Sequence, residues 1–173
     1  MFEHWDGFYL LLGGAAGALI GLMFVVATLT SRLDLDKAVR GASVYMTPVI
    51  FHFAAVLVMS ALATVPHAPQ PFVAAATGLA ALIGLGAALR VAVVLRTGRV
   101  MTPAHWTDFW WYGMGPVAAY LALGASAGAI AAGFEHAAGL FAATLVGLLL
   151  LSIRNAWDLV IWIAPRAETP EEL

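Results

Sequence analysis

Five long apolar stretches alternate with shorter polar segments along the chain. The apolar stretches cover about residues 8–29, 47–65, 72–95, 114–133 and 137–164. A helix needs about 20 apolar residues to span the hydrocarbon core of a bilayer, and these stretches have that length. The pattern therefore predicts an all-α bundle of five transmembrane helices. We expect one transmembrane domain over residues 1–165, followed by a polar C-terminal tail at 166–173.

The segments between the apolar stretches explain where the helices end. Residues 66–71 contain three prolines in six positions, and proline is not tolerated inside a helix. Residues 133–136 are expected to form a tight turn. Before the fourth span, Thr102 and Pro103 resemble a helix N-cap followed by proline at the first helical position. Residues 103–112 contain Trp106, Trp110, Trp111 and Tyr112, which predicts a short cytoplasmic interfacial helix with an aromatic belt that leads into the fourth span.

Composition excludes a water-soluble globular protein. Hydrophobic residues make up 62% of the chain, charged residues 10%, and the mean hydropathy is +0.92. Soluble domains have about 45–50% apolar and about 25% charged residues. The chain has no cysteine, which excludes disulfides and thiol chemistry, and its net charge of −2 favours no nucleic-acid partner. We expect an integral protein of the bacterial inner (plasma) membrane, in contact with the lipid bilayer.

The basic residues fix an expected orientation. In the five-helix arrangement they all fall on one side of the membrane: Arg32, Lys37, Arg40, Arg90, Arg96, Arg99, Arg154 and Arg166. Lysine and arginine accumulate on the cytoplasmic side of membrane proteins. The distribution therefore predicts an N-terminus outside and a C-terminus in the cytoplasm.

The second to fifth helices form two similar hairpins. Each hairpin begins with Pro-Val and has a polar ring four residues after the proline, which is His52 in the first hairpin and Tyr120 in the second. Each returning helix has an arginine near its inner end, Arg90 or Arg154. These correspondences predict two parallel repeats, to which the first helix is added.

Small residues recur every four positions on several helices. The longest series is the glycine zipper Gly13, Gly17 and Gly21 on the first helix, and the last helix has Gly139, Ala143 and Gly147. Small residues let helix backbones approach closely in lipid. The series on the first helix indicates either packing within one chain or a contact between subunits of a homo-oligomer.

Ionisable and amide groups within the membrane form a predicted polar layer near the cytoplasmic side. Its members are His52, Arg90, Arg154, Asn155 and Asp158. Arg154 and Asp158 are spaced i, i+4 on one helix, so their side chains can pair. Such groups usually face the bundle interior. The layer is interpreted either as the lining of a polar pathway or as a set of contacts that hold helices together.

A second cluster is predicted on the outer side. It comprises Glu3, His4, Asp6, His67, Glu135 and His136, with no basic side chain among them. Acidic groups at a pore mouth concentrate cations, whereas the simpler interpretation is a set of solvated loop residues. The spacing matches no dedicated metal site, and we expect no metal or other cofactor.

The sequence favours transport over catalysis. Residues 124–128 read Gly-x-Ser-x-Gly, but the serine lies within a helix instead of at a strand-to-helix turn, so no enzyme is expected. The leading hypothesis is a homo-oligomeric channel or carrier for a small cation or proton, with its pathway at the subunit symmetry axis. The alternative is a non-transporting membrane subunit that binds or regulates a partner membrane protein through small-residue helix faces.

Overall fold

The computed structural model describes Phe2 and residues 5–30, 45–97 and 106–163, with side chains omitted at 29–30 and 162–163. The elements are α1 (Asp6–Thr30), α3 (Thr47–Ala63), α4 (Gln70–Arg96), α5 (Trp106–Asp108), the π-helix η2 (Phe109–Met114), α6 (Gly115–Ala131) and α7 (Ala137–Ile163). The described residues contain no strand, which confirms the all-α class. The long helices begin and end within two residues of the ranges expected from the apolar pattern. The predicted tail lies outside the described residues.

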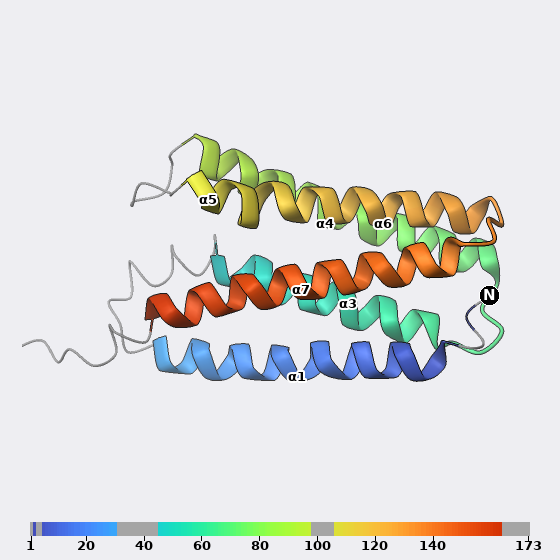
Figure 1. Ribbon diagram of the computed structural model, residues 1–173, viewed down its shortest axis with the longest axis horizontal. Helices are drawn as coiled ribbons and strands as arrows, with labels where there is room; N and C mark the ends of the chain where they lie inside the picture. The colour runs from blue at the N-terminus through green and yellow to red at the C-terminus, as the bar shows by residue number, and fades with distance from the viewer. Residues whose placement is uncertain (1, 3–4, 31–44, 98–105, 164–173) are drawn as a thin grey trace, which may run out of the picture.

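The long helices lie side by side and run in alternating directions (Figure 1). We call one end of the bundle the turn end, because it holds the start of α1 and the two short connections at 64–69 and 132–136. The opposite end, where α1 and α7 finish, is called the basic end, since Arg90, Arg96 and Arg154 lie toward it. The first helix therefore begins at the opposite end from where the last one finishes.

Among the residues that the structure describes, four helical segments are long and apolar enough to cross a membrane. They are Asp6–Thr28, Gln70–Arg96, Trp106–Ala131 and Ala137–Ile161. The remaining long helix, α3, is apolar but has only 17 residues. At 1.5 Å per residue it is about 26 Å long, somewhat less than the roughly 30 Å hydrocarbon core. These helices indicate an integral membrane protein with four to five spans.

The turn predicted at 133–136 lies between α6 and α7 and begins with a glycine. Gly133 has φ +66°, a conformation that costs glycine little. The amide of Phe134 donates to Ala129 and that of Gly133 donates to Ile130, which together form a Schellman motif. The other turn, between α3 and α4, has positive φ at His67 (54°), directly after the first of its prolines.

In the residues that the structure describes, the helix predicted before the fourth span is continuous with that span. From Trp106 to Ala131 the backbone stays helical, so α5 and η2 lead directly into α6. The helix continues through Pro116, although the ring of a proline clashes with a carbonyl of the preceding turn in a regular α-helix. A wider π-helical turn precedes the proline, and the Gly115 amide donates to Trp110, five residues back. The expected cap at Thr102 and Pro103 lies outside the described residues.

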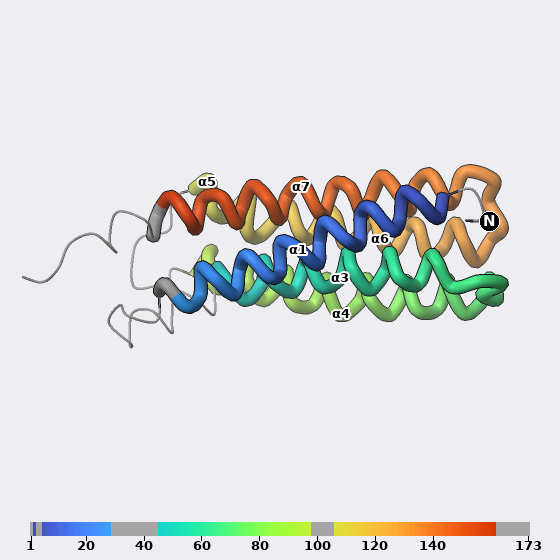
Figure 2. The backbone as a smooth tube through the Cα atoms, turned by 90° about the horizontal axis from the view of Figure 1, so that it is seen from below, coloured from blue at the N-terminus to red at the C-terminus, as the bar shows by residue number. Residues whose placement is uncertain are grey.

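The first helix crosses the other helices obliquely. Figure 2 shows α1 passing from beside α7 at the turn end toward α3, and α1 contacts both. At the turn end, aromatic rings of Phe2, Tyr9 and Phe141 pack together, with centroids 5.5–6.0 Å apart. The helices α4 and α6 also pack against each other, where small side chains allow a close approach.

Candidate functional site

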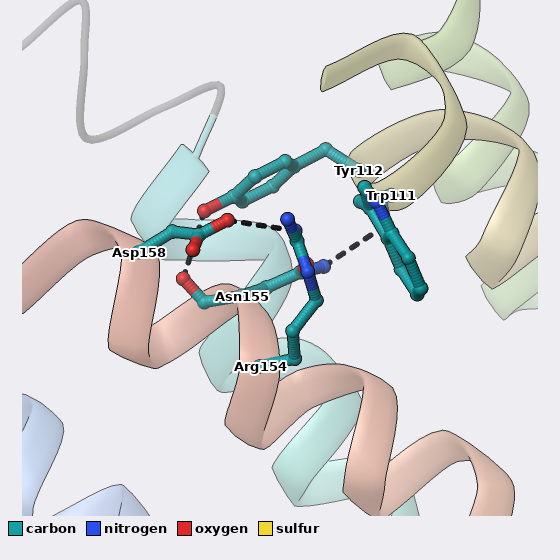
Figure 3. Close-up of polar contacts among 5 residues, drawn as sticks. All are labelled: Trp111, Tyr112, Arg154, Asn155 and Asp158. Atoms are coloured by element: carbon teal, nitrogen blue, oxygen red, sulfur yellow. Dashed lines mark hydrogen bonds and ion pairs between the residues drawn. The ribbon is translucent and has the colours of Figure 1, made fainter. Parts of the chain in front are cut away.

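The predicted ion pair on α7 forms near the basic end of the bundle. The Arg154 Nη1 atom lies 2.7 Å from Asp158 Oδ2. The Arg154 guanidinium also lies over the Trp111 ring, 4.3 Å from its centroid, so the cation is held between a carboxylate and an aromatic face (Figure 3). The two charged side chains are 37% and 41% exposed. The pair is therefore at the margin of the bundle and not deep in its core.

Asn155 joins α7 to the π-helix. Its side-chain Nδ2 donates to the Trp111 backbone carbonyl at 3.0 Å, and the backbone carbonyl of Asn155 accepts from the Tyr112 hydroxyl at 2.8 Å. In a regular helix the Gly115 amide would donate to Trp111, but here it donates to Trp110. The next residue is Pro116, which has no amide proton. The Trp111 carbonyl is therefore left without a backbone donor, and the buried Asn155 side chain supplies one.

His52 belongs to a different polar contact. Its Nδ1 lies 2.8 Å from the Tyr120 hydroxyl, which joins α3 to α6, and both side chains are almost fully buried. The Tyr120 ring lies directly against the backbone of Gly84 on α4. A Cβ added to this glycine would come within 2.0 Å of the ring. Gly84 therefore provides the space that lets Tyr120 reach the histidine.

The predicted polar layer is thus divided. Arg154, Asn155 and Asp158 lie together on α7, whereas His52 pairs with Tyr120 and Arg90 lies exposed on α4. His52 is 2% exposed and Asn155 1%. A pathway that either residue lines would therefore run inside the bundle of one chain and not along an axis between subunits.

Several contacting residues were not among the predicted site residues. The sequence predicts Tyr112 as part of an interfacial aromatic belt, but its side chain is buried and hydrogen-bonded. Its ring also packs edge-on against Tyr45, 5.0 Å away. Burial, together with the charge of Asp108 and a hydrogen bond to its side chain, raises the pKa of Tyr45 above its usual value of 10. The only sequence signal for Tyr120 was its position after proline, which corresponds to that of His52.

The serine of the Gly-x-Ser-x-Gly segment is buried and contacts its own helix and α7. The Ser126 hydroxyl donates to the Ala122 carbonyl at 2.9 Å, one turn earlier on its own helix. It also lies 3.4 Å from the Thr144 hydroxyl on α7. These contacts connect α6 to α7 and agree with the interpretation of this segment as a packing element.

The described members of the outer cluster lie at the turn end. Asp6, His67, Glu135 and His136 are all exposed, while Glu3 and His4 lie outside the described residues. Within the part of the chain that the structure describes, no group of three or more His, Cys, Asp or Glu side chains could hold a metal ion.

No protein-family model matches the chain, and no characterised protein or solved structure shows significant similarity to it. The polar contacts and the exposed helix faces are therefore the features from which a function can be proposed.

The three glycines of the α1 series differ in what they contact. A Cβ at Gly13 would lie 3.2 Å from the Ser60 Cβ, and one at Gly17 would lie 4.0 Å from Leu57, so both glycines face α3 in the same chain. A Cβ at Gly21 would meet nothing within 4 Å. Packing within one chain accounts for the first two glycines and leaves the third on an open face.

Proposed function

We propose that the protein is an integral membrane subunit that binds a helix of a partner membrane protein. The observation that carries this proposal is the small-residue series on α7, in which Gly139 is half-buried and Ala143 and Gly147 are exposed. A Cβ at either glycine would meet nothing within 4 Å. The series lines a groove of about 460 Å³ between α1 and α7, with Trp5 and Phe8 on its other side.

Glycine on a lipid-facing helix surface lowers helix stability unless a second helix packs against it. Glycine lowers helix stability relative to alanine by roughly 0.5–1 kcal/mol. Small residues four apart recover stability when they let a second backbone approach closely. The groove on α7 has this spacing, and its other lining residues, such as Ala142 and Val146, are apolar. Its chemistry suits an apolar helix.

Photo-cross-linking in native membranes tests the proposal. A photoreactive amino acid at Ala143 should give a discrete adduct with one protein, and Gly147→Leu should abolish that adduct by filling the groove. The matched control is the same probe at Leu82, a lipid-exposed position on α4. If Ala143 and Leu82 give the same lipid-only products, the α7 face does not bind a partner and the proposal fails.

Transport of a small cation or proton is the second proposal. It is supported by three buried polar contacts spaced along the bundle: Tyr112 with Asn155, His52 with Tyr120, and Ser126 with Thr144. Because these contacts are internal, the pathway would lie within one chain. A homo-oligomer is proposed only as an additional level of assembly.

We also propose the orientation and location that the charge distribution supports. The N-terminus and the turn end would face outward, and the basic end would face the cytoplasm of a bacterial inner membrane. Arg90, Arg96 and Arg154 all lie toward the basic end, in agreement with the preference of basic residues for the cytoplasmic side.

A further inference from the structure

The returning helices of the two hairpins, α4 and α7, bury corresponding residues. The buried positions of α4 are Val73, Ala74, Thr77, Ala81, Gly84, Ala88, Val91, Ala92 and Leu95. Counted from Arg90 and Arg154, the corresponding positions of α7 are Ala137, Ala138, Phe141, Leu145, Leu148, Ser152, Asn155, Ala156 and Leu159. All of these are buried except Ala156, which is half-buried. The buried surface is therefore repeated between α4 and α7, whereas several buried positions of α3 correspond to exposed positions of α6.

The contacts between the hairpins indicate an approximate two-fold axis parallel to the helices. The helix pairs α3–α7 and α4–α6 correspond to each other, and both are in contact. His52 and Tyr120 occupy corresponding positions and hydrogen-bond to each other. Corresponding residues meet in this way next to a two-fold axis.

The first helix is added to only one side of this arrangement. It occupies the groove between α3 and α7 at the turn end. There Gly13 lies against Ser60, which is 1% exposed, and the Tyr9 hydroxyl approaches the Ala138 carbonyl at 3.5 Å. We call this the α1 groove.

The corresponding groove on the other side, the α4–α6 groove, is open. Counted from the prolines and the arginines, Ser60 corresponds to Gly128 and Ala138 to Ala74. A groove of about 440 Å³ lies at these positions, lined by Pro71, Ala74, Ala75, Ala127, Gly128 and Ala131. Gly128 is exposed, and a Cβ added there would meet nothing within 4 Å. The side-chain amide of Gln70, at the edge of the groove, already donates to the Ile130 backbone carbonyl at 2.5 Å, and the other lining residues are apolar.

We propose that the α4–α6 groove binds a transmembrane helix of a partner protein whose contact face resembles that of α1. A two-fold axis parallel to the helices preserves helix direction, so the bound helix would begin at the turn end, as α1 does. It would place a small residue against Gly128 and direct an aromatic hydroxyl toward the Ala74 carbonyl. The inference rests on the proposed function but uses a different face from the groove on α7.

A peptide of residues 1–30 is a suitable probe, because α1 fits the corresponding groove. The peptide with Gly13→Cys is reconstituted in lipid vesicles with the full chain carrying Gly128→Cys, and the mixture is oxidised. The chain has no other cysteine, so each disulfide is assigned without ambiguity. We expect several-fold more peptide–protein adduct from Gly128→Cys than from Gly86→Cys, an exposed α4 position that also has open space. Adding Ala75→Leu should remove the adduct by filling the groove.

Three outcomes would overturn the inference. Equal adduct yields at Gly128→Cys and Gly86→Cys would mean non-specific contact. Adduct at Ser60→Cys and none at Gly128→Cys would mean that the peptide only displaces α1 from its own groove. Disulfides between two Gly128→Cys chains, with no peptide adduct, would make the groove a contact between copies. This experiment uses purified components and the α4–α6 groove, whereas the cross-linking at Ala143 uses native membranes and the α7 groove. Failure of this inference can therefore be distinguished from failure of the proposed function.

Discussion

His52 and Tyr120 hydrogen-bond to each other in the core of the bundle, 2.8 Å apart, although they lie on two different hairpins. Each is the first polar ring after the Pro-Val pair that begins its hairpin. The contact therefore connects corresponding positions of the two repeats. It also satisfies two polar groups that would be costly to bury alone.

Tyr120→Phe should destabilise the protein, because it leaves the His52 Nδ1 atom without a partner. An unsatisfied buried polar group costs about 1–3 kcal/mol. The double variant His52→Phe/Tyr120→Phe should lose less than the sum of the single variants, with a coupling of at most about 1.7 kcal/mol, as found in other membrane proteins. Unfolding in mixed detergent micelles measures both quantities. Strict additivity would show that the hydrogen bond contributes nothing.

Gly84→Ala should be strongly destabilising, because its Cβ would lie 2.0 Å from the Tyr120 ring. Overpacking of this kind costs roughly 1–3 kcal/mol. Gly86 on the same helix is the matched control, since a Cβ there meets nothing within 4 Å. Gly86→Ala should be neutral or slightly stabilising, as alanine favours helix. Equal melting temperatures for the two variants would contradict the packing of Tyr120 on Gly84.

The helices could be predicted because length and hydropathy determine membrane spans. The Gly133 turn was also predictable, since a local motif sets it. The pairing of Asn155 with the Trp111 carbonyl was not, because it depends on Pro116 and the π-helical turn before it. The partner of His52 depends on how two hairpins pack, and the spacing along one helix does not contain that information.

The orientation can be checked with single cysteines, since the chain has none of its own. His67→Cys in the turn after α3 and Thr97→Cys at the end of α4 are both exposed and lie at opposite ends of the bundle. If the turn end is outside, an impermeant thiol reagent should label only His67→Cys in whole cells, and both sites after lysis. Labelling of Thr97→Cys in whole cells would reverse the proposed orientation.

Tyr45 should make stability sensitive to alkaline pH. Its pKa is raised in the folded protein by burial and by Asp108, so the unfolded chain loses the proton first. The stabilisation is therefore fully present below pH 10 and is lost as the pH rises through the folded pKa. Tyr45→Phe should be less stable than the wild type at pH 8, and the difference should shrink at alkaline pH. A difference that is constant with pH would contradict this account.

The charged pair on α7 can separate the transport proposal from the partner-binding proposal. Arg154 and Asp158 are 37% and 41% exposed, so removing one of them should cost less than the roughly 3–5 kcal/mol of a fully buried pair. Variants should therefore fold, and a change in flux would not simply reflect unfolding.

The decisive variant is Arg154→Gln/Asp158→Asn, reconstituted in liposomes beside the wild type. Arg96→Gln serves as the control, because it removes a charge at an exposed position on another helix. If the pair borders a pathway, the double variant should change proton or cation flux and Arg96→Gln should not, since fixed charges set local ion concentration. If the pair only holds Trp111 and α7 together, all three proteins should show the same flux. Wild-type flux equal to that of protein-free liposomes would remove the transport proposal and leave binding of a partner helix as the function that the exposed α7 face supports.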